Sequence, residues 1–277
     1  MMYPSKGEHA LFGMNSSFEE ADIVVLPIPY ESTGSYKVGT RFGPKAIIAA
    51  SNELETFDLE LNKNLCDLKI CTLPEMEVDV SSPEAMVDEI EEVVSQILGR
   101  EKFFILLGGE HTITVGAVKP LAKKAKNLTV LSLDAHADMR DVFQNSKYSH
   151  ACVMRRCLEH AKLVLGGVRS MSEEEFEFIH ENKVPVYDVS EAKKIIKSCE
   201  KNVYLSLDLD VFDPSVIPGV GCPVPLGVNI QPVLQLLRDL FKERNVIGVD
   251  VVELIPDGLS EDIAAFIAAK ILAYKSF

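Results

Sequence analysis

The sequence lacks the features that mark membrane, secreted and disulfide-bonded proteins. No apolar run among its 277 residues is long enough to span a bilayer, and residues 1–20 have no apolar core of signal-peptide length. Its six cysteines form no C-x-x-C pair, and a chain of this size does not depend on disulfide bonds for stability. We therefore expect a soluble, cytoplasmic protein with reduced thiols and no membrane partner.

The chain also lacks any sign of a domain boundary. No stretch rich in Gly, Ser or Pro divides it, and it contains neither a low-complexity segment nor a repeat. With 47% apolar residues it can bury a large core, and a typical domain size of about 150 residues allows one or two domains. The missing linker favours a single domain over residues 1–277.

Positive charge is scarce. The formal net charge of −14 disfavours nucleic acid and anionic lipid as partners, because both require clustered Lys and Arg. Cationic ligands fit this balance better. Most of the acidic residues lie in runs such as DEIEEV and SEEEFEF, which are typical of solvated helix faces, so the total charge alone is a weak guide to function.

Several common catalytic motifs are missing. The chain has no G-x-S-x-G elbow and no G-x-x-x-x-G-K-[ST] loop, and no cysteine lies in a motif that marks a nucleophile. The glycine-containing stretch PGVGCPVP lacks the third glycine and the following helix of a dinucleotide-binding fingerprint. Chemistry must therefore come from other side chains.

Short apolar runs rich in β-branched residues predict eight strands, most of them apolar on both faces. The predicted strands are 22–28, 69–74, 102–108, 128–133, 162–168, 184–189, 202–207 and 246–252. Helix-like segments alternate with them at 44–53, 83–98, 112–126, 172–181, 190–199, 229–243 and 259–274. This alternation predicts a parallel sheet covered by helices on both faces.

Two predicted strands end in the same letters, LSLD. The first continues as SLDAHADMR, which places Asp134, His136 and Asp138 at alternate positions. The second continues as LSLDLDVFDPS and places Asp208 and Asp210 at the same spacing. Alternate side chains of an extended segment share one face, so each set converges on a small volume, where unpaired charges are costly to bury.

Two further strand ends carry polar groups, His111 in ILLGGEHTITV and Glu253 in VIGVDVVEL. Ligands of open α/β sheets collect at the carboxyl ends of the strands. Each residue alone is also explained as a cap or an ordinary polar contact. Together, four aspartates and two histidines without a thiolate suit Mn²⁺ or a similar divalent ion, and two ions about 3.5–4 Å apart would use all six ligands.

The ordered motifs resemble those of the ureohydrolases, the arginase and agmatinase family. PYESTGSYKVGTRFGPKAI at 29–47 resembles the N-terminal glycine-rich segment of that family, and its three metal motifs are matched by GGEHT at 108–112, DAHAD at 134–138 and SLDLDVFDPS at 206–215. The resemblance covers nearly the whole chain. It implies a three-layer αβα sandwich around a parallel eight-stranded sheet, and a homo-oligomer, commonly a trimer or hexamer.

The resemblance also implies a dinuclear manganese site and its ligands. One Mn²⁺ is expected to be bound by His111, Asp134, Asp138 and Asp208, and the other by Asp134, His136, Asp208 and Asp210. In the family mechanism a hydroxide bridging the two ions attacks the guanidinium carbon, and Asp138 also orients that hydroxide. The products are urea and an amine.

Two further roles follow from the same resemblance. Glu253 is expected to bind the guanidinium through paired charge-assisted hydrogen bonds, unless it only caps the following turn. His150, in KYSHACVMRR, matches the family's histidine that relays protons to the leaving amine, although alone it would be read as a surface-loop residue. Catalytic residues are thus His150, Asp138 and Glu253, with Glu253 and His150 contacting the substrate.

A small cationic guanidino compound is the expected substrate, and agmatine, cleaved to putrescine and urea, is the first choice. The loop MRDVFQNSKYS resembles archaeal-type agmatinases more than arginases. Arg140 and Arg155 leave arginine and guanidinobutyrate open, because either could meet a carboxylate, unless both are surface cations. Cys222 and the pair Leu226-Gly227 depart from the family's usual threonine and Gly-Gly.

Two alternative functions from other classes of protein are also considered. A non-catalytic metal-binding protein on the same fold is disfavoured because all six ligands are present. Metal-dependent deacylation, as in deacetylases of related fold, is disfavoured by GGEHT and by Glu253, which suit a guanidinium better.

Overall fold

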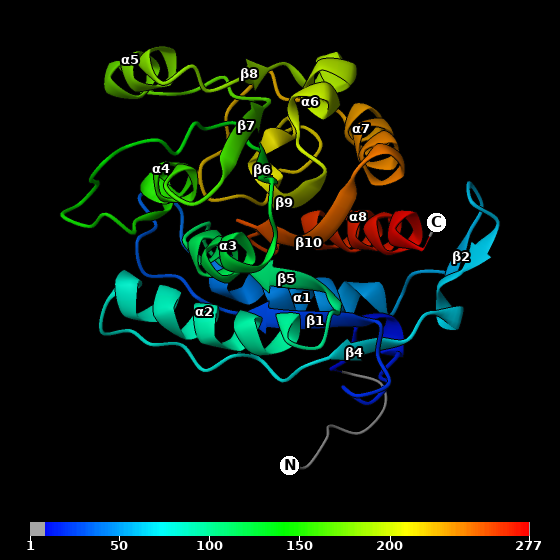
Figure 1. The fold of residues 1–277 in the computed structure, drawn as a ribbon. Coiled ribbons are helices and arrows are strands. Elements are labelled where there is room, and N and C mark those ends of the chain that lie inside the picture. Colours follow the sequence, from blue (N-terminus) through cyan, green and yellow to red (C-terminus); the bar gives the residue numbers. More distant parts are fainter. Residues whose placement is uncertain (1–8, 277) are drawn as a thin grey trace.

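The computed structural model describes residues 9–276, and an eight-stranded sheet runs through its centre (Figure 1). Every pairing in this sheet is parallel, and the strand order is β4-β1-β5-β10-β9-β6-β7-β8. The strands of the sheet are β1 Ile23–Ile28, β4 Ile70–Thr72, β5 Phe103–Gly108, β6 Leu128–Leu133, β7 Lys162–Gly166, β8 Val186–Tyr187, β9 Asn202–Asp208 and β10 Asn245–Val252. The eight predicted strands are therefore confirmed.

Within residues 9–276, seven α-helices lie between strands and an eighth follows β10. They are α1 Gly43–Ser51, α2 Pro83–Leu98, α3 Ile113–Lys124, α4 Val153–Leu158, α5 Glu173–Glu181, α6 Ala192–Ser198, α7 Ile230–Glu243 and α8 Ser260–Lys275. Local sequence sets their starts, as in α2, where Pro83 follows Ser82, whose side chain accepts a hydrogen bond from the N–H of Ala85 at 3.1 Å. Within residues 9–276, none of the helices combines the length and the apolarity needed to cross a membrane.

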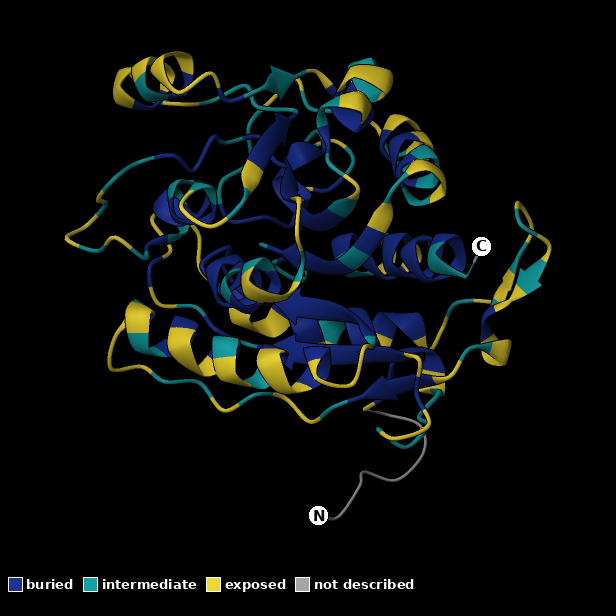
Figure 2. Ribbon diagram, viewed as in Figure 1, coloured by how far each residue is buried: buried dark blue, intermediate teal, exposed yellow. Residues whose placement is uncertain are grey.

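The helices cover both faces of the sheet and bury two apolar cores. One core joins the sheet to α1, α6, α7 and α8, and the other joins it to α2, α3, α4 and α5. Alternate residues of β9 divide between them, since Val203 and Leu205 belong to the first core and Tyr204 to the second. Figure 2 shows the consequence, with buried strands in the middle and exposed helix faces outside. The predicted αβα sandwich is confirmed.

The chain order explains why the central strands end at one place. β5 and β6 are consecutive in the chain but are not neighbours in the sheet. The later strands β10 and β9 lie between them. As a result β5, β10, β9 and β6 lie side by side with their carboxyl ends at the same edge. Each of these ends was predicted to carry polar side chains, and parallel pairing brings them together.

Two differences from the predicted elements concern short segments. An antiparallel pair of two-residue strands, β2 Phe57–Asp58 and β3 Lys63–Asn64, projects beside α8, and the short helix α4 follows the loop after β6. Elements of this length carry too few residues for a periodic pattern. The edge strands β4 and β8 are also shorter than predicted, because each pairs on one side only.

Candidate dinuclear metal centre

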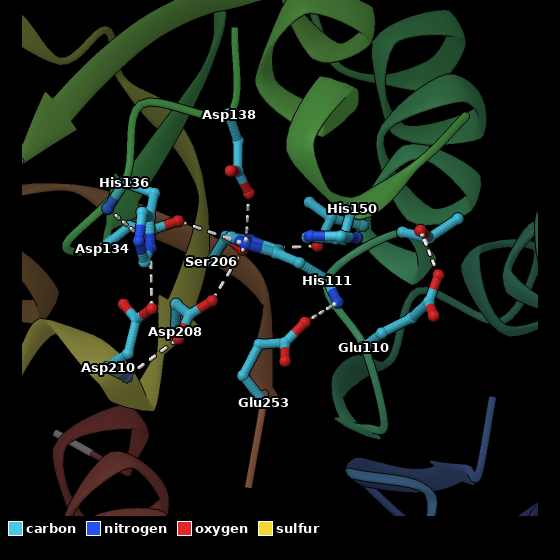
Figure 3. A network of polar contacts seen from close by, with 12 residues as sticks. Glu110, His111, Asp134, His136, Asp138, His150, Ser206, Asp208, Asp210 and Glu253 are labelled. Atoms are coloured by element: carbon cyan, nitrogen blue, oxygen red, sulfur yellow. Dashed lines mark hydrogen bonds and ion pairs between the residues drawn. The ribbon is translucent and has the colours of Figure 1, made fainter. Parts of the chain in front are cut away.

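The carboxyl ends of β5, β6 and β9 bring the six predicted metal ligands into one cluster (Figure 3). Nδ1 of His111, after β5, lies 3.2 Å from an oxygen of each of Asp134, Asp138 and Asp208. Nδ1 of His136 lies 2.8 Å from Asp210. Two groups of donor atoms, each within 4.8 Å, share Asp134, and this arrangement matches two neighbouring metal positions.

Three of the aspartates are held in the same way. One oxygen of each accepts a backbone N–H, from His136 to Asp134 at 2.5 Å, from Asp210 to Asp208 at 2.8 Å, and from Ala135 to Asp210 at 2.9 Å. The other oxygen points at a histidine of the cluster. The backbone therefore fixes each carboxylate and leaves one oxygen for a ligand.

A buried network behind His111 fixes the orientation of its ring. Nε2 of His111 lies 2.8 Å from Oγ of Ser206, and that hydroxyl donates to Asp250 at 2.6 Å. Because the only hydroxyl hydrogen of Ser206 goes to Asp250, Nε2 of His111 is the donor to Ser206. Nδ1 then carries the lone pair that faces the three carboxylates, as a metal ligand requires.

Two buried atoms of the cluster have no hydrogen-bond partner among residues 9–276, Nδ1 of His111 and Oδ2 of Asp134. Buried polar atoms are rarely left without a hydrogen bond, and these two face each other at the shared end of the cluster. An oxygen and nitrogen donor set with orphaned lone pairs fits divalent metal ions. The residues present therefore fit the dinuclear site that the motifs predict.

The crowding of buried charges changes the pKa values of the cluster's aspartates and histidines. Burial, followed by the charge of Asp210, raises the pKa of Asp134 to about 7, and the same two causes raise the pKa of Asp208 well above its usual value. Burial alone would lower the pKa of His136, but its bond to Asp210 raises that pKa to about 10. Without added cations the cluster therefore holds protons at neutral pH.

Glu253 lies at the end of β10, next to the cluster. Its Oε1 accepts the backbone N–H of His111 at 2.8 Å, and burial, together with the charge of Glu110, raises its pKa to about 8. Glu253 and Asp138 both have left-handed backbones, with φ of 68° and 50°. Such conformations cost about 1–3 kcal/mol each and are concentrated at functional sites, where they direct side chains.

His150 begins a short 3₁₀ helix, His150–Cys152. It lines a cavity of about 250 Å³ together with Asp138, Asp208, Asp210 and Glu253. The structure thus brings all eight predicted site residues to one cavity or its floor, including His111 and Asp134 beneath it.

The comparison with known proteins agrees with this geometry. The sequence profile of the arginase family matches residues 21–276. The N(1)-aminopropylagmatine ureohydrolase of Synechocystis sp. is 38% identical over 94% of this chain and 90% of its own length. The agmatinase of Pyrococcus horikoshii is 35% identical over 92% of this chain and 91% of its own length. The crystal structure of the agmatine ureohydrolase of Thermoplasma volcanium superimposes with a TM-score of 0.89 and 32% identity, covering 100% of this chain and 96% of that one.

The chain belongs to the arginase family. The predicted family, the αβα fold and the assignment as a hydrolase of amidine C–N bonds are therefore confirmed. Its fold and its groups of donor atoms imply a dinuclear metal site.

Arg140 and Arg155, the two cations that left the substrate open, lie in different surroundings. Arg140 lines the cavity, 3.8 Å from Glu175 and with its guanidinium 5.3 Å from the centre of the Phe143 ring. Arg155 lies outside the cavity lining, over the ring of Phe178 at 3.2 Å. Only Arg140 can therefore act on a substrate in this cavity.

The two departures from the family pattern also differ in position. Cys222 lines the cavity and lies 3.8 Å from Oγ of Ser35. Leu226 is 91% exposed, does not line the cavity, and has a φ of 64°, a conformation that favours glycine. Cys222 is thus the departure that reaches the site, whereas Leu226 replaces a glycine at the surface.

The sequence motifs do not indicate three further residues in or behind the site, Asp250, Glu110 and Glu175. Asp250 lies inside β10 at a position that the apolar pattern marks as core, and Glu110 precedes a metal ligand without facing the metal cluster. Glu175 belongs to an acidic run that was assigned to a solvated helix face, yet it is 4% exposed and lines the cavity. A polar residue inside a buried strand was the available signal for Asp250.

Proposed function

We propose that the protein hydrolyses the guanidino group of a cationic amine, agmatine or N(1)-aminopropylagmatine, to urea and the free amine, with two Mn²⁺ ions as cofactor. The relatives' names support both substrates. The part of the substrate beyond the guanidino group, its tail, is proposed to be cationic because of the charge of the cavity lining. That lining holds five carboxylates and a single arginine.

His111, Asp134, His136, Asp138, Asp208 and Asp210 would hold the two ions. Oxygen and imidazole donors without thiolate suit Mn²⁺, as the family resemblance implies. When bound, ions of this kind supply a nucleophile by lowering the pKa of water toward neutrality. The remaining tasks fall to residues of the chain itself.

Glu253 positions the guanidinium beside the cluster. Its carboxylate can pair with two N–H groups of the planar cation, which fixes both its orientation and its identity. Hydrolysis forms a C–O bond to the guanidinium carbon and breaks a C–N bond, and the leaving nitrogen must gain a proton. His150 lines the same cavity and is suited to deliver that proton.

The tail of the substrate would contact the cavity residues outside the metal cluster. The four aspartates balance two divalent ions, Glu175 and Arg140 balance each other, and Glu253 with a hydroxide nucleophile leaves an excess of negative charge. A dicationic or tricationic amine neutralises this excess better than zwitterionic arginine, and guanidinobutyrate carries no net charge to do so. This balance favours substrates without a carboxylate.

The test is a urea assay of the Mn²⁺-loaded protein with agmatine, N(1)-aminopropylagmatine, arginine and guanidinobutyrate. We expect urea from one or both of the cationic amines at a kcat/KM at least about tenfold above that for arginine. Urea mainly from arginine or guanidinobutyrate would contradict the proposed tail. No urea from any of the four, or turnover of an acyl-lysine instead, would contradict the reaction.

Arg140→Gln tests the cavity charge directly. If the tail is cationic, removing this like charge should lower KM for the amine by about two- to fivefold, the scale of a partly exposed charge pair. If Arg140 binds a carboxylate, KM for arginine should rise instead. Arg155→Gln is the matched control, because that guanidinium lies outside the cavity lining, and it should leave both KM values unchanged.

A further inference from the structure

Glu110 is a buried carboxylate that the metal site does not use. It is 1% exposed and precedes the metal ligand His111, but its side chain points to the other side of the chain. Its Oε2 accepts the backbone N–H groups of Ser32 and Thr33, both at 2.6 Å. Its Oε1 accepts the hydroxyls of Thr33 at 2.7 Å and Thr112 at 2.6 Å. A buried charge held by four donors is costly to maintain without a function.

Thr33 connects this carboxylate to His150. Oγ1 of Thr33 lies 3.0 Å from Nδ1 of His150 and also accepts the backbone N–H of His150 at 3.0 Å. A threonine hydroxyl has a single hydrogen, and the shorter contact to the Glu110 carboxylate uses it. Oγ1 can then only accept from the ring, so Nδ1 of His150 must carry a hydrogen.

We infer that Glu110 and Thr33 are positioning residues that hold the neutral His150 ring as its Nδ1–H tautomer and leave Nε2 as the nitrogen that exchanges protons in the cavity. Nε2 lies 3.4 Å from Oγ of Ser35, which also lines the cavity, so this nitrogen is on the cavity side. The role of the proton at Nε2 rests on the proposed function, whereas the tautomer itself does not.

The same arrangement occurs at His111, the buried histidine of the site. His111 donates from Nε2 to Ser206, which donates to Asp250, and this leaves Nδ1 for the metal. His150 donates from Nδ1 to Thr33, which donates to Glu110, and this leaves Nε2 for the cavity. Opposite ring nitrogens are thus freed by the same hydroxyl and carboxylate pairing, one for coordination and the other for proton transfer.

Other contacts of the ring do not fix the tautomer. Oγ of Ser149 lies 3.4 Å from Nδ1, which is longer than the Thr33 contact, and the ring of Phe143 meets the imidazole edge to face with centres 5.9 Å apart. Thr33 is therefore the partner whose removal should change the protonated nitrogen, while removal of the Ser149 hydroxyl should not.

The test combines tautomer and kinetics in the full-length protein. Solid-state ¹⁵N NMR of protein labelled at its histidine rings and loaded with diamagnetic Mg²⁺ reports which nitrogen carries hydrogen, and His150→Asn assigns the signal among six histidines. At a pH where the ring is neutral, we expect Nδ1–H in the wild type, Thr33→Ser and Ser149→Ala proteins. In Thr33→Val we expect a mixture with Nε2–H.

The kinetic arm uses whichever guanidino compound the protein cleaves. Thr33→Val should lower kcat by about ten- to a hundredfold with KM within about twofold and metal content unchanged, and Thr33→Ser should restore kcat. An Nε2–H ring in the wild type, or a Thr33→Val spectrum identical to wild type, would overturn the inference. If no guanidino compound is cleaved but the spectra behave as expected, the proposed function fails and the tautomer assignment stands.

Discussion

Two acidic clusters of this protein neutralise their charge in different ways. In the first, Asp58 and Glu60 of the β2–β3 hairpin both bind the ammonium of Lys270 on α8, at 2.8 and 2.7 Å. Tyr274 donates to Glu60 and Arg238 lies 3.2 Å from it. The chain thus supplies its own cations, and the bond to Lys270 holds the pKa of Glu60 below its usual range.

The second cluster, at the carboxyl ends of β5, β6 and β9, has no lysine or arginine among its ion pairs in residues 9–276. The only cationic side chains in those ion pairs are histidines, and burial raises the pKa of Asp134 to about 7, whereas the pKa of Glu60 is lowered. The difference indicates that an acidic cluster without its own cation requires one from outside. Under the proposed function, metal ions would complete the metal cluster, and the substrate guanidinium would do the same for Glu253.

Asp134→Asn, in the metal cluster, should have the largest effect of the substitutions that test this comparison. The amide keeps an oxygen for the N–H of His136 but removes the shared charge, so we expect metal loss and a fall in kcat on the order of 10³-fold. Because a raised pKa means that ionised Asp134 destabilises the folded state at neutral pH, the metal-free variant should melt at a higher temperature than the metal-free wild type. A lower melting temperature would contradict the account of crowding.

Asp58→Asn is the matched change in the other cluster and should have the opposite sign. Removing this charge leaves Lys270, whose side chain is 9% exposed, with one fewer partner. We expect destabilisation by about 2–3 kcal/mol, less than the about 3–5 kcal/mol of a fully buried pair because Glu60 remains bound. Thermal unfolding measures it, with kcat of the folded protein unchanged. Equal stability of variant and wild type would remove the contrast between the clusters.

Glu253→Gln sharpens the comparison at the substrate. A neutral amide cannot provide the charge-assisted bonds, so KM should rise by about ten- to a hundredfold, the effect of a charged hydrogen bond worth about 1.5–3 kcal/mol. Metal content, measured by elemental analysis, should be unchanged, because Glu253 bonds to the backbone of His111 rather than to its ring. Unchanged kcat and KM would exclude Glu253 from guanidinium binding.

The pH dependence of metal binding tests the same charge crowding without a substitution. Since metal-free Asp134 has a pKa of about 7 and His136 of about 10, both hold protons that a metal ion must displace. Apparent affinity should therefore rise between pH 6 and 8, by up to about tenfold per unit for each proton released. Calorimetry in buffers of different ionisation enthalpy counts these protons. Affinity independent of pH would contradict the predicted protonation.

Much of the fold follows from the sequence because its signals are local. The β5 run FFILLG is short and apolar on both faces, which is typical of a strand buried in a parallel sheet, and Ser82-Pro83 marks the start of α2. The hairpin that carries Asp58 could not be predicted in this way. Its strands have two residues each, and its position depends on the contact with Lys270, some 210 residues later in the chain.

The convergence of the predicted metal ligands follows from the sequence for a related reason. D-x-H-x-D and D-x-D spacings at strand ends place their side chains on one face before any tertiary contact is known. The residues behind the ligands could not be predicted in this way, because Asp250, Glu110 and Thr33 reach the histidines through contacts between distant segments. Sequence spacing therefore predicts which atoms face the cavity, whereas the hydrogen bonds that orient them need the folded structure.

The most direct test of the central claim is a Mn²⁺ titration of the chelator-treated protein, followed by calorimetry and thermal unfolding. We predict binding of two ions per chain and, at about 1,000 times the dissociation constant, stabilisation by about 4 kcal/mol for each bound ion. Asp58→Asn should bind the same number, and Asp134→Asn fewer. Absence of binding, or binding without a rise in melting temperature, would contradict the conclusion that external cations complete the metal cluster.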